Sequence, residues 1–337
     1  MYQGFYKLKE NPFRLSPDPA FMCMTKQHQE AMSGLIYTVC TRSGLTVLLG
    51  EAGTGKTTLL YSLLGLLERR GFYTAMCTNP TLTRQEFCDF LITKFGVDCQ
   101  SPLKSRQLVA LEEKLKKNQA EGRPSVLIVD EAQRLSTELL EEVRLLLNLE
   151  TPREKLLEII VSGQPELGDI LGRPDLRQLK QRVSCICRLE PLTLEEVREY
   201  ISHRLARAGL PSQTLFSDAT IALIHGYSHG IPRLINSLCD GALRTGFALQ
   251  SPKITPTVVE EAAKDLDLTW WSGLAQPNGS GSVAPPVLSE APSPLPLVSQ
   301  NGNNGSASPQ PEVPLESYTA RQKSMSFFSN LVDRWRH

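Results

Sequence analysis

A glycine-rich stretch with the sequence GEAGTGKTT occupies residues 50–58 and has residue types suited to holding phosphate groups. It follows the apolar run LTVLL at 45–49 and leads into TTLLYSLLGLLERRG, which has the apolar spacing of a helix. Glycines allow the backbone amides to turn inward around phosphate oxygens, and the start of the following helix adds its positive dipole end. The alternative is a glycine turn that occurs here by chance. Because such a turn would not be expected between a strand and a helix in this way, we interpret residues 50–58 as a phosphate-binding loop.

The side chains of this loop have separate expected roles toward a nucleoside triphosphate. Lys56 should reach the β- and γ-phosphates, the Thr57 hydroxyl should ligate Mg²⁺, and Thr58 can hydrogen-bond a nearby phosphate. The other nucleotide-binding positions are Gly50, Glu51, Ala52, Gly53, Thr54 and Gly55. The chain has no NKxD-type motif that reads guanine, so the expected ligands are ATP and Mg²⁺.

Two acidic residues follow a second apolar run, SVLIVDEAQ at 125–133. Ligands bind at the carboxyl ends of strands in open α/β sheets, where Asp130 and Glu131 would emerge. Asp130 would hold Mg²⁺, and Glu131 would orient and polarise the attacking water. The alternative is that the acids cap a helix, since DEAQRLSTELLEEV could begin one there. Their place beside a phosphate loop favours the metal and water roles.

Short apolar runs alternate with longer helical patterns between residues 45 and 190. The runs are 45–49, 72–77, 125–130, 157–163 and 183–189. Near-continuous apolar strands separated by helices predict a parallel sheet with helices on both faces, and hence an α/β fold. Only helical patterns follow in 193–267, with helix-start signals at Thr193, which has Glu195 and Glu196 behind it, and at Ser217 or Asp218.

The predicted organisation is an N-terminal segment, an α/β nucleotide-binding domain, a small all-helical lid, a linker and a tail. Their bounds are 1–44, 45–190, 191–268, 269–320 and 321–337. The linker is rich in Pro, Gly, Ser and Asn and is expected to be disordered. The tail contains SMSFFSNLVDRWRH, a short amphipathic pattern that could dock on a membrane surface or in a partner's groove, or could fray.

The 337-residue chain carries 36 basic and 36 acidic residues, so its net charge gives no electrostatic case for nucleic acid or an anionic membrane. Its eight cysteines include no CxxC pair, and we expect reduced, mostly buried thiols in a cytosolic protein. Cys185 and Cys187 should point to the same face of a strand, which suits packing better than a disulfide. No signal peptide or membrane span is expected.

The stretch HGIPRLINSL at 229–238 predicts a helix that begins at Pro232 and places Arg233 in its first turn. The helix dipole disfavours a cation there by roughly 0.3–1 kcal/mol, so an anion is expected nearby. From the residues alone, that anion could be a phosphate or an acidic neighbour such as Asp240.

Six motifs in this order resemble the AAA+ ATPases of the general secretion pathway protein A (ExeA) type, and most closely a branch associated with exosortase and exopolysaccharide loci. They are NPFRLSPDPAFM, GEAGTGKTTLL, VLIVDEAQ, SGQPEL, LKQRVSCICRLEPLT and GIPRLIN, and the resemblance covers residues 1–267. DNA-transposition ATPases share much of this core. The resemblance implies a P-loop NTPase (AAA+) sheet followed by a helical lid.

The resemblance also implies roles for polar residues outside the loop. Gln164 matches a sensor 1 residue, and Arg233 matches a sensor 2 residue beside the γ-phosphate. Arg182 matches an arginine finger supplied to a neighbouring subunit, which implies a homo-oligomer. Residues 11–15 and Ile231 would lie near the adenine.

Each of these roles has an alternative. Gln164 could only cap the following helix. Arg177 could supply the finger, and Arg182 could be an ordinary surface arginine. His28 could lie beside the nucleotide or face solvent.

The leading hypothesis is a Mg²⁺-dependent ATPase, converting ATP and water to ADP and phosphate, that assembles or remodels machinery for envelope secretion or polysaccharide export. It would be cytoplasmic and could associate with the inner membrane through secretion or export components. The alternative is a DNA-associated AAA+ regulator of the transposition target-selection type, although no winged-helix or helix-turn-helix pattern follows the lid. A third hypothesis is a switch in which ATP occupancy, rather than turnover, carries the signal.

Overall fold

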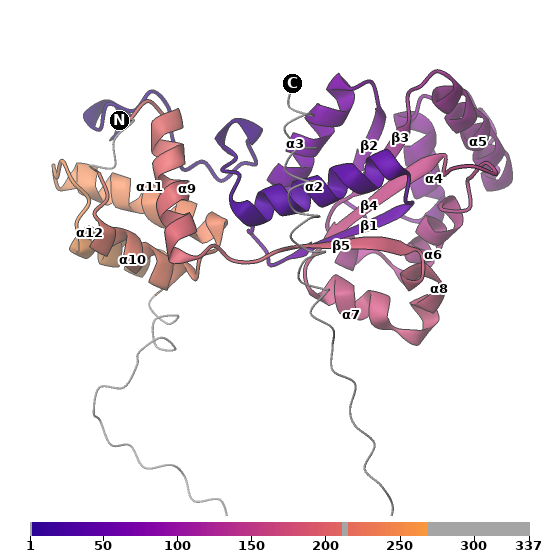
Figure 1. Cartoon of the computed structure of the whole chain (residues 1–337). Coiled ribbons are helices and arrows are strands. Elements are labelled where there is room, and N and C mark those ends of the chain that lie inside the picture. The colour runs from indigo at the N-terminus through magenta and orange to yellow at the C-terminus, as the bar shows by residue number, and fades with distance from the viewer. Residues whose placement is uncertain (1, 211–214, 269–337) are drawn as a thin grey trace, which may run out of the picture.

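The computed structural model of the chain describes residues 2–210 and 215–268. These residues form a sheet lobe and a helical lobe that lie side by side (Figure 1). The expected linker at 269–320 and amphipathic tail at 321–337 lie outside the described residues. No helix in the described part of the chain has the length and apolar character needed to cross a membrane.

The sheet lobe is built on five parallel strands in the order β2-β3-β4-β1-β5. The strands are β1 (Leu45–Gly50), β2 (Tyr73–Cys77), β3 (Ser125–Val129), β4 (Leu157–Gly163) and β5 (Val183–Leu189). The three central strands are buried along their whole length, whereas β2 and β5 form the edges and are only partly buried. The predicted parallel sheet with flanking helices is therefore confirmed.

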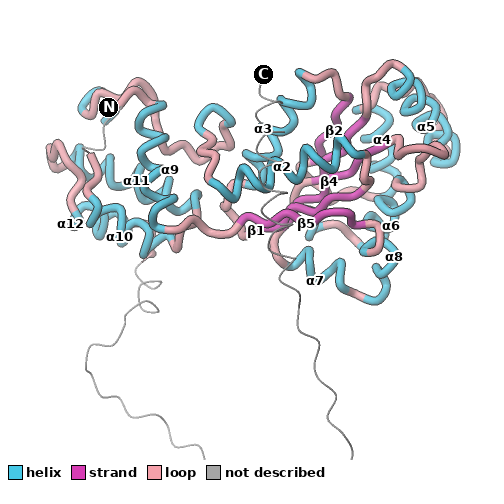
Figure 2. The backbone as a smooth tube through the Cα atoms, in the orientation of Figure 1, coloured by secondary structure: helices cyan, strands magenta, loops and turns pink. Residues whose placement is uncertain are grey.

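Helices cover both faces of this sheet (Figure 2). The α-helices of this lobe are α2 (Lys26–Thr41), α3 (Lys56–Arg69), α4 (Arg84–Lys94), α5 (Lys104–Ala120), α6 (Thr137–Leu146), α7 (Glu166–Gly172) and α8 (Arg177–Lys180), with 3₁₀ turns η2 (Ala132–Arg134) and η3 (Pro174–Leu176). Side chains alternate along each strand. Val47 and Leu49 therefore join the core under α4 to α7, whereas Leu48 joins the core under α2 and α3.

The helical lobe contains α9 (Leu194–Arg207), α10 (Asp218–Ser228), α11 (Pro232–Ala248) and α12 (Pro256–Asp265). The predicted helix starts are confirmed. Thr193 and Glu196 form a capping box at α9, and the Ser217 side chain caps α10. Each such cap stabilises a helix by about 1 kcal/mol, because it satisfies backbone N–H groups that have no partner within the helix.

The first residues of the chain pack on the helical lobe, which is formed by residues far away in the sequence. After α1 (Tyr2–Phe5), the side chains of Tyr6, Phe13 and Phe21 enter the core formed by α9 to α12, and Phe21 closes the 3₁₀ turn η1 (Pro19–Phe21). The chain then runs into α2 on the sheet. This segment therefore ties the two lobes together alongside the β5–α9 connection (Figure 1).

A buried carboxyl group lies in β4, on the strand between β1 and β3. Glu158 is only 4% exposed; its Oε2 accepts a 2.8 Å hydrogen bond from the Gly44 N–H, and its Oε1 has no partner. Burial raises the pKa of Glu158 to about 7, against a smaller opposing effect of that hydrogen bond. The folded chain therefore holds a proton that the unfolded chain releases at lower pH.

We predict that Glu158→Gln removes a pH-dependent loss of stability. Because the folded-state pKa is raised, the contribution of Glu158 is present at acidic pH and is lost as the pH rises through about 7. Between pH 5.5 and 8 the free energy of unfolding of the wild type should fall by about 2 kcal/mol more than that of the variant. Urea unfolding of both proteins at both pH values measures this. An equal difference at the two pH values would contradict it.

Candidate functional site

The glycine-rich loop connects β1 directly to α3. Gly53 and Gly55 have φ values of 86° and 98°, a left-handed backbone that favours glycine. Lys56, the first residue of α3, folds its side chain back over the loop. Its Nζ donates hydrogen bonds of 2.6 Å and 2.9 Å to the carbonyl oxygens of Gly50 and Glu51.

The ammonium group of Lys56 is suited to an anionic ligand. Its side chain is 5% exposed, and burial lowers its pKa, although Glu131 and Asp130 nearby oppose the shift. Its hydrogen-bond partners are neutral carbonyl oxygens, which leave a buried positive charge without a direct ion pair. A bound phosphate would supply that ion pair.

The Thr57 hydroxyl and the Asp130 carboxylate lie together at the end of β3. Thr57 Oγ1 donates a 2.6 Å hydrogen bond to Asp130 Oδ2, and the Glu131 N–H donates to Asp130 Oδ1 at 3.0 Å. Hydroxyl and carboxylate oxygens are ligands that Mg²⁺ prefers. No cluster of three or more His, Cys, Asp or Glu in the described chain could hold a metal by itself.

Glu131 is held in an unusual conformation at the strand end. Its φ is 54°, a left-handed value that costs a non-glycine residue about 1–3 kcal/mol and occurs often at functional sites. Its Oε2 accepts a 2.8 Å hydrogen bond from Gln133 Nε2. The helix-cap alternative does not hold, because Ser136 caps α6 and the Glu131 side chain caps no helix.

Gln133 joins this acidic pair to the neighbouring strand, a role that the sequence analysis missed. Its Oε1 accepts a 3.2 Å hydrogen bond from the backbone N–H of Gln164, the residue after β4. The only signal in the sequence was its place in the DEAQ motif. The Gln164 side chain lines the cavity beside the loop, and no side chain caps α7.

Arg233 lies in the first turn of α11, as predicted from Pro232. Its backbone N–H donates a 3.2 Å hydrogen bond to the Gly53 carbonyl, and its side chain lines the cavity. Asp240 is engaged elsewhere, since it pairs with Arg244 at 3.3 Å and accepts a hydrogen bond from Tyr2. The acidic neighbour considered for Arg233 is therefore not its partner.

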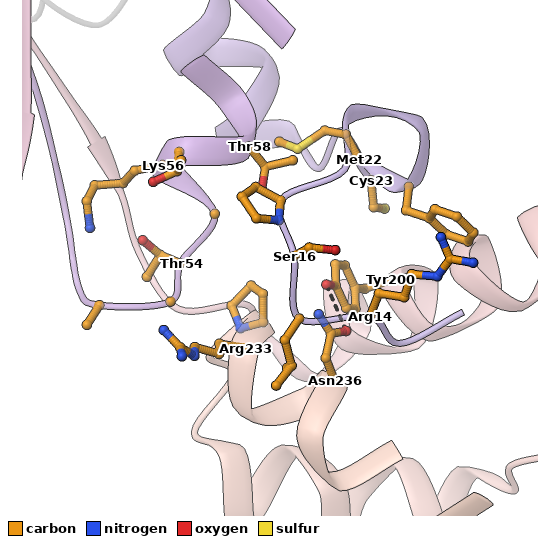
Figure 3. Close-up of a pocket in the computed structure, with 18 of the residues that line it drawn as sticks. Arg14, Ser16, Met22, Cys23, Thr54, Lys56, Thr58, Tyr200, Arg233 and Asn236 are labelled. Carbon is orange, nitrogen blue, oxygen red and sulfur yellow. Dashed lines mark hydrogen bonds between the residues drawn. The ribbon is translucent and has the colours of Figure 1, made fainter. Parts of the chain in front are cut away.

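A cavity of about 400 Å³ lies between the two lobes. Figure 3 shows Thr54, Lys56 and Thr58 of the loop on one side of it, with Arg14, Tyr200 and Asn236 across from them. This volume is within the range of small-molecule sites. The loop, the N-terminal segment and the lid therefore all line one cavity.

The segment expected near the adenine is divided between two environments. Arg14 and Leu15 line the cavity, whereas Phe13 packs edge-to-face on Phe216 in the lid and Asn11 donates a hydrogen bond to Asp240. Ile231 does not line the cavity; its Cγ2 lies 3.1 Å from where a Cβ on Gly53 would be.

His28 is buried beside the loop, so the solvent-facing alternative for this residue is wrong. It is 4% exposed; its Nδ1 lies 2.8 Å from Thr25 Oγ1 and its Nε2 lies 3.4 Å from the Thr54 carbonyl oxygen. Burial lowers the pKa of His28, which favours the neutral ring at physiological pH.

The far end of the cavity contains lid residues that the sequence analysis missed. Tyr200 donates a 3.0 Å hydrogen bond to Asn236, and the buried Arg204 guanidinium lies over the Phe21 and Tyr200 rings. Their helical spacing is that of ordinary lid-core positions, so the sequence held no signal for them.

The two candidate finger arginines lie outside this cavity. Arg177 and Arg182 are exposed and precede β5, and neither is among the residues that line the cavity. Arg182 Nη2 donates a 3.2 Å hydrogen bond to Asn148, and Arg177 lines a second cavity with Lys180.

Comparisons with known proteins agree with this fold and loop. Residues 40–171 match the AAA domain family. The solved structures with similar folds include Cdc6p from Pyrobaculum aerophilum, with a TM-score of 0.58, 17% identity, and coverage of 78% of this chain and 70% of that one. They also include the ORC2 protein of Aeropyrum pernix in its ADPNP and ADP complexes, with a TM-score of 0.57, 15% identity, and coverage of 76% and 72%.

The described residues have the fold of a P-loop NTPase of the AAA+ class. Within that class, the chain is similar to general secretion pathway protein A of Aeromonas hydrophila, with 39% identity over 280 residues. The aligned region covers 81% of this chain and 51% of that protein. The expected resemblance to general secretion pathway protein A is thereby confirmed, and the chain spans about half the length of this relative.

We predict that Gly53→Ala separates the lid from the loop. A Cβ at this position would lie 2.7 Å from Arg233 Cβ, and the φ of 86° strains any side chain. The free energy of unfolding should fall by about 1–3 kcal/mol, and nucleotide affinity should fall at least tenfold. Chemical unfolding and nucleotide titration measure these effects.

Gly65→Ala in α3 is the matched control. Its Cβ would meet only the end of the Arg69 side chain at 3.6 Å, so stability should be unchanged or higher. Equal behaviour of the two variants would refute the lid contact.

Proposed function

We propose that the protein is a Mg²⁺-dependent ATPase whose site is formed by the loop, the β3 end and the lid. Lys56, Thr57 and Asp130 would hold the Mg²⁺-bound triphosphate, with the amides of residues 50–55 around its phosphates and Thr58 beside them. Three observations support this: the buried ammonium of Lys56, the Thr57–Asp130 hydrogen bond, and the cavity beside the loop. When bound, Mg²⁺ would neutralise charge on the phosphate oxygens.

Glu131 is the group proposed to activate water. Its carboxylate would accept a hydrogen bond from the attacking water and orient it toward the γ-phosphate. The hydrogen bond from Gln133 fixes one carboxylate oxygen and leaves the other for water. Gln164 and Arg233 would contact the γ-phosphate from the β4 end and the lid.

An arginine from a neighbouring copy would complete the site. An arginine finger stabilises charge on the transferring phosphoryl group and can contribute about 10³–10⁵ in rate. The exposed position of Arg182 ahead of β5 and its single hydrogen bond to Asn148 leave it free to be redirected to a partner. Hydrolysis would then require a homo-oligomer.

The proposed biological role is ATP-driven assembly or remodelling of envelope secretion or polysaccharide-export machinery. The observation that carries it is the 39% identity over 280 residues to general secretion pathway protein A. Its partners would be other copies of the chain and membrane components of that machinery, and the protein would act in the cytoplasm at the inner membrane.

We predict that Glu131→Gln binds Mg²⁺·ATP with nearly wild-type affinity and hydrolyses it at least about 100-fold more slowly. The amide keeps the shape of the carboxylate but cannot accept a proton from water.

Affinity capture of the variant from cells in ATP, against ADP as the control, should retain membrane secretion or export components. Unimpaired turnover would remove Glu131 from its role, and retention of DNA alone would favour the transposition-type alternative.

We predict that Arg182→Ala binds ATP normally but loses turnover by about 10³-fold. Mixing it with Lys56→Ala subunits should restore activity, because these carry the finger although their own sites are disabled. Steady-state ATPase assays of the single variants and the mixture measure this. Arg177→Ala is the matched control and should keep its turnover. If Arg177→Ala loses turnover instead, and mixing with Lys56→Ala subunits restores it, the finger is Arg177.

A further inference from the structure

Two cysteines share one face of an edge strand. Cys185 and Cys187 are two residues apart in β5, so their side chains point the same way, toward α2. Their Sγ atoms lie 3.8 Å apart, and both thiols are free. Cys187 is 7% exposed, whereas Cys185 is only partly buried and can be reached from solvent.

A glycine in α2 makes room for the two sulfur atoms. A Cβ on Gly34 would lie 2.9 Å from the Cys187 sulfur and 3.9 Å from the Cys185 sulfur. A glycine inside a helix costs about 1 kcal/mol relative to alanine. This cost falls where α2 crosses the thiol pair. The two sulfur atoms therefore lie against the α2 backbone at Gly34, where no side chain stands between them and the helix.

A bond between these sulfurs requires the strand to shorten locally, because a disulfide brings its Cβ atoms to about 3.5–4.5 Å. Two residues of a strand span roughly 6.6 Å between Cα atoms, close to the upper limit of about 6.8 Å for a disulfide. The pairing of β5 with β1 skips Ser184, since Leu45 pairs with Val183 and Thr46 with Cys185. This irregularity lies just before Cys185, whereas Cys185 and Cys187 themselves pair in register with Thr46 and Leu48. The segment can bend because β5 is an edge strand, held by a neighbour on one side only.

The two thiols also differ from each other in the way that thiol exchange requires. The hydrogen bond between the two thiols lowers the pKa of Cys185 and raises that of Cys187, while burial opposes the first shift and adds to the second. The more accessible sulfur is therefore the better nucleophile, and the buried thiol stands beside it as the resolving group.

We propose that Cys185 and Cys187 form a redox-active dithiol that low-molecular-weight disulfides oxidise to an intrastrand disulfide. The Cys185 thiolate attacks the external disulfide, forms a mixed disulfide and releases one thiolate, which takes up a proton. Cys187 then loses its proton and attacks the Cys185 sulfur, which releases the second external thiol. The two protein sulfurs are oxidised, the external disulfide is reduced to two thiols, and a dithiol reductant reverses the reaction.

This pair lies close to the phosphate loop along the strand. Leu189, two residues beyond Cys187, pairs with Gly50, and its carbonyl oxygen lies 2.7 Å from where a Cβ on Gly50 would be. Bending β5 would therefore shift the start of the loop and the connection to α9. Oxidation is expected to raise the Kd for Mg²⁺·ATP several-fold.

The test is peptide mapping of the full-length protein after equilibration with oxidised glutathione and alkylation of the remaining thiols. Trypsin releases residues 183–188, which contain both cysteines and no others. We expect this peptide to escape alkylation, to lose two hydrogen atoms in mass, and to regain both thiols after dithiothreitol. Recovery of the peptide with two alkyl groups, or with glutathione attached, would overturn the proposal.

Two variants complete the experiment. In Cys185→Ser, the remaining Cys187 should be alkylated under the same conditions; in Cys99→Ser, the matched control outside the strand, the disulfide should still form. Nucleotide titration of the reduced and oxidised wild type then tests the link to the loop. Equal affinities would overturn that link, and the peptide map is independent of it because it requires no ATPase activity.

Discussion

The 2.6 Å hydrogen bond from Thr57 to Asp130 is the interaction on which the site depends. It joins the start of α3, which follows β1 through the loop, to the end of β3, and β4 lies between these two strands. It can form only when all three strands are parallel, in register and end at one edge. The buried sheet core is therefore what brings together the two oxygens proposed to bind Mg²⁺, and the loop glycines turn the backbone toward the same point.

The lid is coupled to this edge by few contacts. The Arg233 N–H bonds to the Gly53 carbonyl, and the N-terminal segment, anchored in the lid core by Phe13, carries Arg14 into the cavity. A triphosphate bound here would touch the sheet lobe and the lid together, so its presence would favour one arrangement of the lobes. The thiol pair lies on β5, the strand that continues into the lid, and would act on the same junction.

Much of this arrangement could be predicted from the sequence, for identifiable physical reasons. The strands were predictable because buried parallel strands are nearly continuous apolar runs, and Arg233 was placed correctly because Pro232 marks a helix start. Long-range packing was not predictable. The Gln133 bridge depends on β3 and β4 lying side by side, and the burial of His28 depends on how α2 meets the loop. No local pattern encodes either contact.

In the proposed function, one triphosphate binds where the loop, the acidic strand end and the lid meet. Isothermal titration calorimetry of the wild-type protein with ATP in the presence of Mg²⁺, beside Lys56→Ala, tests it most directly. We expect one site per chain in the wild type and no measurable binding in the variant. Absence of binding to the wild type, or equal binding by both proteins, would contradict it.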